Sequence, residues 1–396
     1  VNAPNPPRLT SLDAYRGFVM LAMASAGFRL GEVLRRLPAD APHRSLWEAA
    51  AAQVEHTTWR GCTFWDLIQP SFMFIVGVAM PFADARRRAR GQPWDRRFVH
   101  ALVRAAVLVL LALFLGSQGR AQTDFSFVNV LAQIGLGYPF VFLVLDRRPA
   151  QQLGVALAIL VASWAFFASY PPPGDRVDRA ALGITAPEEE MLPGFAGHWD
   201  KNTNAAAAFD RWFLNRFPRP SDDPFRFNPG GYATLNFVPS IATMIFGVLA
   251  GGWLRGPRTG AEKMLGLVLT GAACLALGMA ADATALCPVV KRIWTPSWVL
   301  FSSAWTCWLL ALFHGVIDVR GHRSWAFPLV VVGANSIAMY VMAQTLKGYT
   351  GRTLKTHFGQ HLFDGTYGPL LESASVLFVF WLVCLWMYRN KIFVKI

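Results

Sequence analysis

The feature that most constrains this chain is a series of long apolar runs that recur from one end of the sequence to the other. They lie near residues 11–31, 64–84, 98–117, 127–145, 151–170, 237–254, 264–284, 297–317, 327–346 and 374–388. A run of about 20 apolar residues is long enough, as a helix, to cross the hydrocarbon core of a bilayer. Only helices and closed barrels satisfy the backbone in lipid, and long continuous runs exclude the alternation of barrel strands. The sequence therefore predicts an all-α, polytopic transmembrane helical bundle of about ten spans.

The basic residues indicate how such a bundle is oriented. The formal net charge is +13, although only 15% of the 396 residues are charged. Ten spans place most of the excess in loops on one side, at Arg86, Arg87, Arg88, Arg90, Arg96, Arg97, Arg147, Arg148, Arg255, Arg258, Lys263, Arg320, Arg323, Arg389, Lys391 and Lys395. The positive-inside rule then predicts one membrane domain over residues 1–396 with both termini in the cytoplasm. The long loops at about 32–63 and 171–236 would face outward.

The same charge distribution bears on partners. Basic loops beside a membrane attract anionic lipid headgroups, so the lipid bilayer accounts for them. No aromatic-interleaved basic stripe or nucleic-acid motif accompanies the charges, and we expect no nucleic-acid partner. The five cysteines show no metal-ligand spacing, and we expect no metal. Cys62 and Cys287 both fall near the predicted outer face, where sequence alone does not decide whether they form a disulfide.

Polar residues within the apolar runs mark candidate functional sites, because they are costly in hydrocarbon. Asp13 and Arg16 lie three residues apart on one face of the first run, where they form an internal ion pair or Arg16 contacts an anionic ligand such as a phosphate. In the ninth run, Asn335 and Ser336 make interhelical hydrogen bonds or stabilise an oxyanion. His314 and Asp318 are spaced as a pair at a helix end.

The densest cluster of reactive side chains runs from Glu55 to Asp66, where the first outward loop enters the second span. Histidine is the side chain that ordinarily changes charge near neutral pH, so His56 suits a general base or a nucleophile. Asp66 could orient that imidazole or cap the N-terminus of the following helix. Trp59 lies between them in the sequence. The cluster is therefore the strongest candidate for chemistry.

Several of these stretches resemble the heparan-α-glucosaminide N-acetyltransferase family of membrane acyltransferases. Arg8–Gly17 is similar to the opening of that family, and His56–Gly61 followed by Asp66–Gly77 is similar to the stretch that bears its catalytic histidine. Gly333–Ile337 and Tyr388–Ile396 also match, so the resemblance runs in order from residue 8 to the end. It implies acetyl transfer from acetyl-CoA to an amino sugar or glycan on the non-cytoplasmic side. His56 would be the catalytic residue, with direct transfer and an acetyl-histidine intermediate both open.

The resemblance also implies roles for other residues. Asp66 would support His56, and Asp13, Arg16, Trp59, Asn335 and Ser336 would contact substrate or acetyl-CoA. The family precedent is compatible with a homodimer. The lysosomal enzyme carries an extra N-terminal portion that is lacking here, which fits a bacterial inner (plasma) membrane.

Two further stretches favour a different function. Asn129–Gly135 and Thr234–Ser240 look more like a bacterial branch whose members are described as N-acetylglucosamine-related transporters. A sugar transporter is therefore the alternative to the acetyltransferase.

Overall fold

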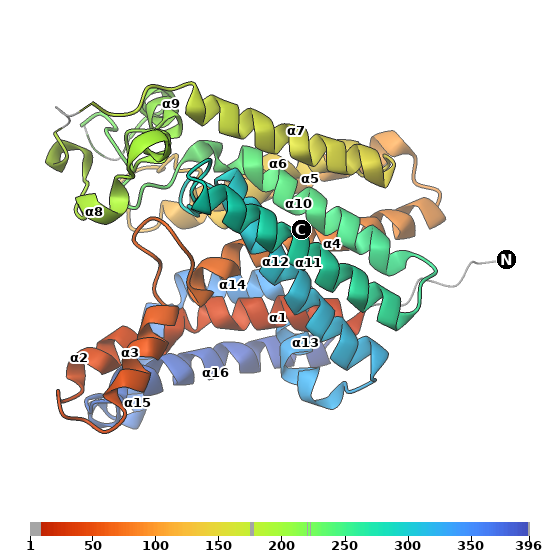
Figure 1. The fold of residues 1–396 in the computed structure, drawn as a ribbon. Coiled ribbons are helices and arrows are strands. Elements are labelled where there is room, and N and C mark those ends of the chain that lie inside the picture. Colours follow the sequence, from red (N-terminus) through yellow and green to blue (C-terminus); the bar gives the residue numbers. More distant parts are fainter. Residues whose placement is uncertain (1–8, 175–177, 220, 222, 395–396) are drawn as a thin grey trace.

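The computed structural model describes residues 9–174, 178–219, 221 and 223–394, all of whose regular elements are helical. Arg8, Lys395 and Ile396 lie outside these ranges. The first half of the chain forms α1 (Thr10–Ala24), α2 (Leu30–Arg36), α3 (Arg44–Gln53), α4 (Ile68–Ala89), α5 (Trp94–Gly116), α6 (Val130–Val144), α7 (Pro149–Ala168) and α8 (Pro187–Glu190). The second half forms α9 (Ala205–Phe213), α10 (Phe237–Arg255), α11 (Gly260–Ala283), α12 (Pro296–Phe313), α13 (Phe327–Ala334), α14 (Ser336–Thr345), α15 (Lys347–Phe358) and α16 (Gly368–Arg389). The predicted all-α membrane bundle is confirmed (Figure 1).

Eight helical segments of the described chain are long and apolar enough to cross a membrane. Each coincides with one of the predicted runs, and two runs take another form. The run near 127–145 becomes the shorter helix α6, and the run near 327–346 becomes α13 and α14, which meet at Asn335 with a bend of 69°. The count of ten spans and the cytoplasmic position of both termini stay predictions.

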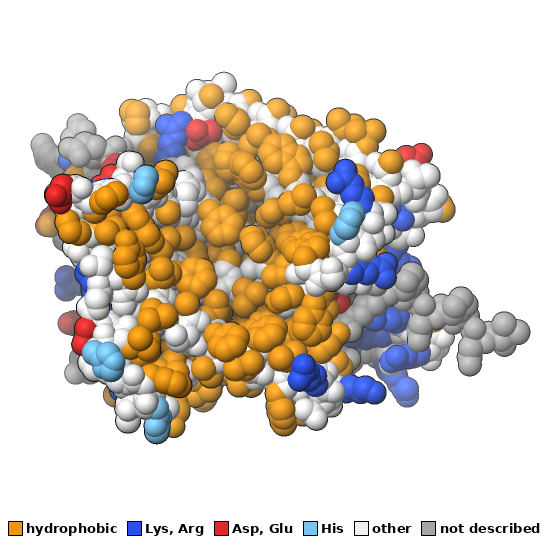
Figure 2. Space-filling view, turned by 90° about the horizontal axis from the view of Figure 1, so that it is seen from below, with side chains coloured by type: hydrophobic (Ala, Val, Ile, Leu, Met, Phe, Trp, Pro, Cys, Tyr) orange, Lys and Arg blue, Asp and Glu red, His pale blue; other side chains and the backbone are white. Residues whose placement is uncertain are grey.

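Lipid-facing and central helices differ in how much of their apolar surface the bundle covers. In the apolar 18-residue stretch of each span, the bundle buries only 17% of the α11 span and 22% of the α16 span, but 67% of the α10 span. The outer helices carry exposed large side chains such as Leu110, Leu269 and Phe378, and Figure 2 shows apolar side chains across the middle of one face. Such surfaces are stable in lipid rather than in water. α10, α4 and α12 therefore form the centre.

Glycines allow the closest helix pairs to touch through their backbones. A Cβ atom on Gly77 of α4 would lie 2.0 Å from the Met244 carbonyl oxygen of α10. At the crossing of α1 and α13, a Cβ on Gly17 would lie 1.8 Å from the Leu329 carbonyl oxygen, and one on Gly333 would lie 1.9 Å from that of Asp13. Small residues at such crossings are the usual basis of helix packing in membranes.

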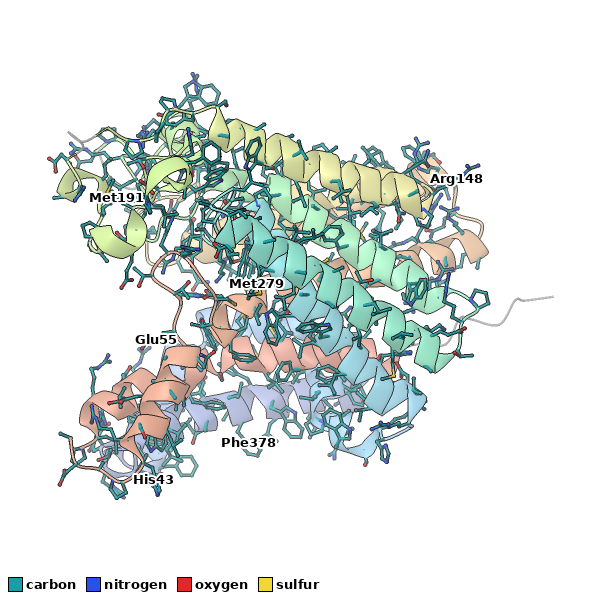
Figure 3. The ribbon with its side chains drawn as sticks, viewed as in Figure 1. His43, Glu55, Arg148, Met191, Met279 and Phe378 are labelled. Atoms are coloured by element: carbon teal, nitrogen blue, oxygen red, sulfur yellow. The ribbon has the colours of Figure 1, made fainter. Side chains whose placement is uncertain are left out.

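The two ends of the bundle have different characters. At one end, here called the loop end, lie α2, α3, α8, α9 and α15; the opposite end, here called the arginine end, carries Arg148 and the C-terminal end of α10 (Figures 1 and 3). Lys and Arg side chains gather toward the arginine end in Figure 2. This distribution is the one that the positive-inside rule uses for orientation.

The loop end has a small apolar core of its own. Trp59 and Trp199 are both buried there, and the Trp59 indole N–H donates to the Trp199 carbonyl oxygen at 3.0 Å. A buried ion pair between Lys201 and Glu190 at 2.6 Å lies in the same layer. The long loop of about 171–236 is therefore packed onto the loop before α4. All five cysteines are free, so Cys62 and Cys287 do not form a disulfide in the structure.

Candidate active site

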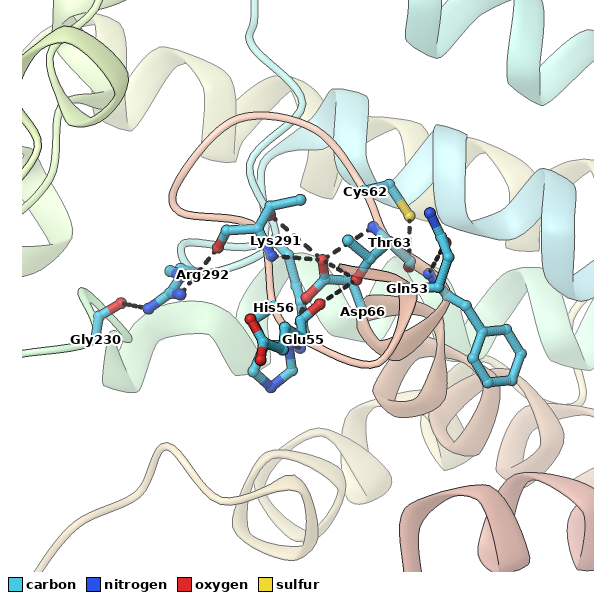
Figure 4. Close-up of polar contacts among 11 residues, drawn as sticks. Gln53, Glu55, His56, Cys62, Thr63, Asp66, Gly230, Lys291 and Arg292 are labelled. Carbon is cyan, nitrogen blue, oxygen red and sulfur yellow. Dashed lines mark hydrogen bonds and ion pairs between the residues drawn. The ribbon is translucent and has the colours of Figure 1, made fainter. Parts of the chain in front are cut away.

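His56 lies in the loop that joins α3 to α4, and the base of this loop is closed by hydrogen bonds. The Gln53 side-chain oxygen accepts from the Phe64 backbone N–H at 3.0 Å, and the Thr63 hydroxyl donates to the Glu55 carbonyl oxygen at 2.6 Å. These contacts hold the two ends of the loop together, so residues 54–63 form a closed loop between α3 and α4 (Figure 4). His56 is thereby carried toward the first turn of the next helix.

Asp66 in that first turn contacts His56, and its two carboxylate oxygens have different hydrogen-bond partners. Oδ1 accepts from His56 Nδ1 at 2.6 Å. Oδ2 accepts from the backbone N–H groups of Thr57 at 3.2 Å and Thr63 at 3.1 Å, the latter being one half of a capping box. The two roles foreseen for Asp66, orienting an imidazole and capping a helix, are therefore both present. The capping contacts fix the carboxylate in the position that the imidazole requires.

Lys291 completes the cluster from a distant part of the chain. Its Nζ lies 3.2 Å from Asp66 Oδ1 and 3.1 Å from His56 Nδ1 (Figure 4). The Lys291 side chain is 4% exposed and that of Asp66 is 1% exposed. Burial lowers the pKa of Lys291 to about 8, against the opposing pull of Asp66. A buried carboxylate and a buried ammonium at this distance compensate each other's lost hydration.

The segment that carries Lys291 is fixed to the His56 loop by its own contacts. Arg60 and Val290 form an isolated bridge, and the Gly61 N–H donates to the Val289 carbonyl oxygen at 2.9 Å. Arg60 also makes a two-pronged contact with Asp282, at 2.9 and 2.8 Å.

Arg292 provides a further tie on the other side of the loop. It donates to the Thr57 carbonyl oxygen at 2.9 Å and to the Gly230 carbonyl oxygen at 2.7 Å. The loop before α10 is thus joined to the residue next to His56.

The arrangement can perform acid–base or nucleophilic chemistry. The His56 side chain is 37% exposed, and within the described chain both of its polar contacts are made by Nδ1. The Asp66 carboxylate can only accept, so the 2.6 Å contact places a proton on Nδ1; the Lys291 ammonium at 3.1 Å then lies beside Nδ1 without donating to it, and the lone pair on Nε2 is available to a substrate. The tautomer is assigned from this hydrogen bond. A carboxylate that holds an imidazole in this tautomer and stabilises the imidazolium is the supporting element of histidine catalysis.

The other predicted site residues do not join this cluster. Trp59 is buried and packs against Trp199, so its assignment to substrate binding stays a prediction. Asp13 and Arg16 lie in α1 and form the expected ion pair at 3.5 Å. His314 and Asp318 are also paired, at 3.2 Å.

Asn335 and Ser336 lie where α13 meets α14. Asn335 is fully buried, and its side chain binds the C-terminal segment: Nδ2 donates to the Ile392 carbonyl oxygen and Oδ1 accepts from the Val394 N–H, both at 3.0 Å. Ser336 is half-buried. The roles of both residues toward a substrate stay predictions.

Sequence reasoning missed Lys291 and Arg292 as site residues. A signal was present, because these two basic residues stand together in a short loop on the side that is otherwise poor in positive charge. Among the described residues, no three His, Cys, Asp or Glu side chains are grouped to hold a metal ion.

Comparison with known proteins gives the chain two relatives. It is 24% identical over 437 residues to heparan-alpha-glucosaminide N-acetyltransferase of Homo sapiens and 22% identical over 425 residues to that of Mus musculus. The alignments cover 99% and 98% of this chain but 60% of each relative, so the chain spans about three fifths of their length. No protein-family model matches the chain. The chain is thus related, at the family level, to heparan-alpha-glucosaminide N-acetyltransferase.

Proposed function

We propose that this multi-pass membrane protein is an acetyltransferase that moves the acetyl group of acetyl-CoA to an amino sugar or glycan. His56 acts as the general base or the nucleophile, and the acceptor binds at the loop end. The observation that carries the proposal is the 2.6 Å contact between His56 and Asp66, backed by buried Lys291. Relatedness to N-acetyltransferases over almost the whole chain supports the same reaction class.

As a general base, His56 Nε2 removes a proton from the acceptor amine while the amine nitrogen attacks the thioester carbonyl. The C–S bond then breaks, and the CoA thiolate takes the proton from the imidazolium. As a nucleophile, Nε2 itself attacks the carbonyl and releases CoA, and the acceptor amine then takes the acetyl group from the imidazole. In both routes Asp66 stabilises the positive charge that develops on the ring.

The bundle separates the two substrates in this proposal. The arginine end faces the cytoplasm, where acetyl-CoA is available, and cationic side chains there, Arg16 included, attract its phosphates. The loop end with His56 faces the opposite side, where a glycan acceptor is found. A bacterial inner membrane is the proposed location, and a homodimer is the proposed assembly.

The test is acetyl transfer by purified protein in detergent. Wild-type protein is given acetyl-CoA and glucosamine, and free CoA and acetylated sugar are measured. We expect His56→Ala to lower turnover by at least about a thousandfold without weakening acetyl-CoA binding. His357→Ala, which removes an exposed histidine of α15, serves as the control and should leave turnover unchanged. Wild-type protein that neither binds acetyl-CoA nor releases CoA would overturn the proposal.

A sugar transporter is the second candidate, and the break between α13 and α14 favours it. Discontinuous spans often form substrate sites in transporters, and this one is bent by 69° at Asn335. Uptake of labelled N-acetylglucosamine into vesicles containing the protein, with no release of CoA, would favour this function. Uptake that is absent while CoA is released would exclude it.

A further inference from the structure

An apolar cavity lies between α7, α9 and the start of α10, near the loop end of the bundle. Its volume is about 230 Å³. The walls include Phe166 and Phe167 of α7, Val238 and Pro239 of α10, and Ile293 from the segment that precedes α12. None of these residues takes part in the proposed chemistry, so the cavity needs an explanation of its own.

The mouth of the cavity lies on a surface that faces lipid. In the α7 span the bundle buries only 28% of the apolar 18-residue stretch. Ala162 and Phe166 line the cavity and are also exposed, Phe166 by 42%. Ala158 and Val155, one and two helical turns nearer the arginine end, are exposed on the same face of α7. The cavity is therefore continuous with the lipid-facing surface of the bundle.

The positions of the wall residues in their helices give the depth of the cavity. Phe166 stands two residues before the last residue of α7, and Val238 is the second residue of α10. Ala162 lies about 9 Å before the end of α7 at 1.5 Å per residue. Trp212 of α9, which lies beside this end of α7 in Figure 1, is 57% exposed, as are many aromatic side chains at headgroup level. The acyl chains of the leaflet at the loop end thus run past the mouth.

The walls suit a hydrocarbon chain better than a polar ligand. Apolar cavities stay dry, and one of about 150 Å³ is large enough to take up benzene. An empty cavity also forfeits dispersion contacts along its walls. Of the polar side chains in the walls, Asn236 already donates to the Arg292 carbonyl oxygen at 2.8 Å, and Ser163 is 8% exposed. A flexible acyl chain fills such a space and requires no hydrogen bonds.

The cavity adjoins the apolar cluster on which the His56 loop packs. Phe167 and Ile293 line the cavity and belong to the same buried cluster as Trp59 of that loop. A chain in the cavity therefore adds apolar contacts to this cluster. Its binding should stabilise the loop end without contact with the reacting groups.

We propose that this cavity binds one acyl chain of a phospholipid from the leaflet at the loop end, and that the bound chain stabilises the cluster around Trp59. The chain enters past Ala162 and Phe166 of α7, and the headgroup stays at the membrane surface. The inference goes beyond the proposed function and does not depend on it, because lipid binding and unfolding are measured without turnover.

The test uses phosphatidylglycerol with a photoreactive diazirine on one acyl chain, added to the delipidated full chain in detergent. After irradiation, mass spectrometry locates the labels, which we expect to concentrate at Phe166 and Pro239. Ala162→Trp and Val238→Phe fill the cavity and should lower labelling there by at least about fivefold. Ala158→Trp is the matched control, because it places the same ring on α7 one turn outside the walls, and its labelling should stay within about twofold of wild type.

Thermal unfolding is the second readout. Unlabelled phosphatidylglycerol should raise the Tm of delipidated wild type and of Ala158→Trp by about 2–4 °C, and that of Ala162→Trp by less than about half as much. Labels spread evenly along α7, or unchanged in the two folded cavity variants, would overturn the proposal. Stronger labelling of the cavity by a photoreactive polyprenyl phosphate would overturn it too. If the cavity is labelled as expected but wild type releases no CoA, the proposed function fails and the lipid site stands.

Discussion

Two polar regions of the bundle use their side chains in opposite ways. At the loop end, Asp66 and Lys291 converge on the partly exposed ring of His56 and leave Nε2 uncommitted within the described chain. Near the crossing of α1 and α13, the buried side chain of Asn335 uses both its amide nitrogen and its amide oxygen in hydrogen bonds to the backbone of the C-terminal segment.

The distance between the two regions adds to the contrast. Asp13 and Ala24 of α1 are separated by about 17 Å at 1.5 Å per residue, and the His56 loop begins beyond the end of α1, where Val54 contacts Gly27. Polarity within a membrane thus has two uses in this chain. One prepares a reactive group, and the other fastens helices and a terminal segment together.

The first prediction tests the reactive region through Asp66. Asp66→Asn directs an amide N–H₂ either at the N–H donors of Thr57 and Thr63 or at Lys291 and His56, which are donors too. We expect turnover to fall about 10³- to 10⁴-fold, as when the carboxylate that fixes a catalytic histidine is lost. Stopped assays of CoA release would measure it.

A control variant separates the chemistry from the cap. Thr57→Val removes a hydroxyl that lies 3.3 Å from Asp66 Oδ2 but keeps the contact with His56, and its turnover should stay within about threefold of wild type. If folded Asp66→Asn protein retains more than a tenth of the wild-type activity, Asp66 does not support a reactive His56, and the assignment of a reactive region at the loop end is wrong.

The second prediction concerns pH and Lys291, whose pKa burial lowers to about 8. Above that pH the ammonium loses its proton and Asp66 loses its counter-charge, so kcat/KM should fall by about tenfold per pH unit. Deprotonation of the acceptor amine acts in the opposite direction and cannot produce this fall. The unfolded chain holds the Lys291 proton up to about pH 10.4, so this group makes stability rise between about pH 8 and 10.

The opposite signs make the experiment decisive. Thermal unfolding and turnover are measured on the same samples from pH 6 to 10. Lys291→Met should lose the alkaline fall along with most of its activity. If kcat/KM still falls at alkaline pH in Lys291→Met, or falls only where the protein unfolds, a group other than Lys291 causes the decrease.

The third prediction tests the fastening region. Asn335→Ala removes both contacts with the C-terminal segment and should lower the free energy of unfolding by about 2–3 kcal/mol, while kcat changes less than about threefold. Ser336→Ala is the adjacent control and should stay within about 0.5 kcal/mol of wild type. A hundredfold loss of kcat in folded Asn335→Ala protein would place Asn335 among the reacting groups, as oxyanion stabilisation requires.

What the sequence predicted and what it missed follow from the range of the interactions. The spans are encoded by local apolar length, and His56 and Asp66 are ten residues apart in one continuous motif, so both could be predicted. Lys291 is 235 residues from His56, and its segment is held beside the His56 loop by long-range contacts such as the bridge between Arg60 and Val290. Asn335, at the break between α13 and α14, is bound by backbone groups that lie 57 and 59 residues further along the chain. No local pattern encodes such contacts.

The smallest expected effect concerns Arg16, which lies in the fastening region but is the best candidate there for contact with a substrate. An ion pair with Asp13 at 3.5 Å, whose Arg16 side chain is 26% exposed, contributes about 0–1 kcal/mol. If packing is its only role, Arg16→Gln and Asp13→Asn should both leave the KM for acetyl-CoA unaltered. If Arg16 also attracts a CoA phosphate, Arg16→Gln should raise that KM by about three- to tenfold, whereas Asp13→Asn should leave it the same or lower it. A rise in KM for Arg16→Gln alone would show that the crossing of α1 and α13 takes part in binding acetyl-CoA. The two regions would then differ in the substrate they bind as well as in their role in the structure.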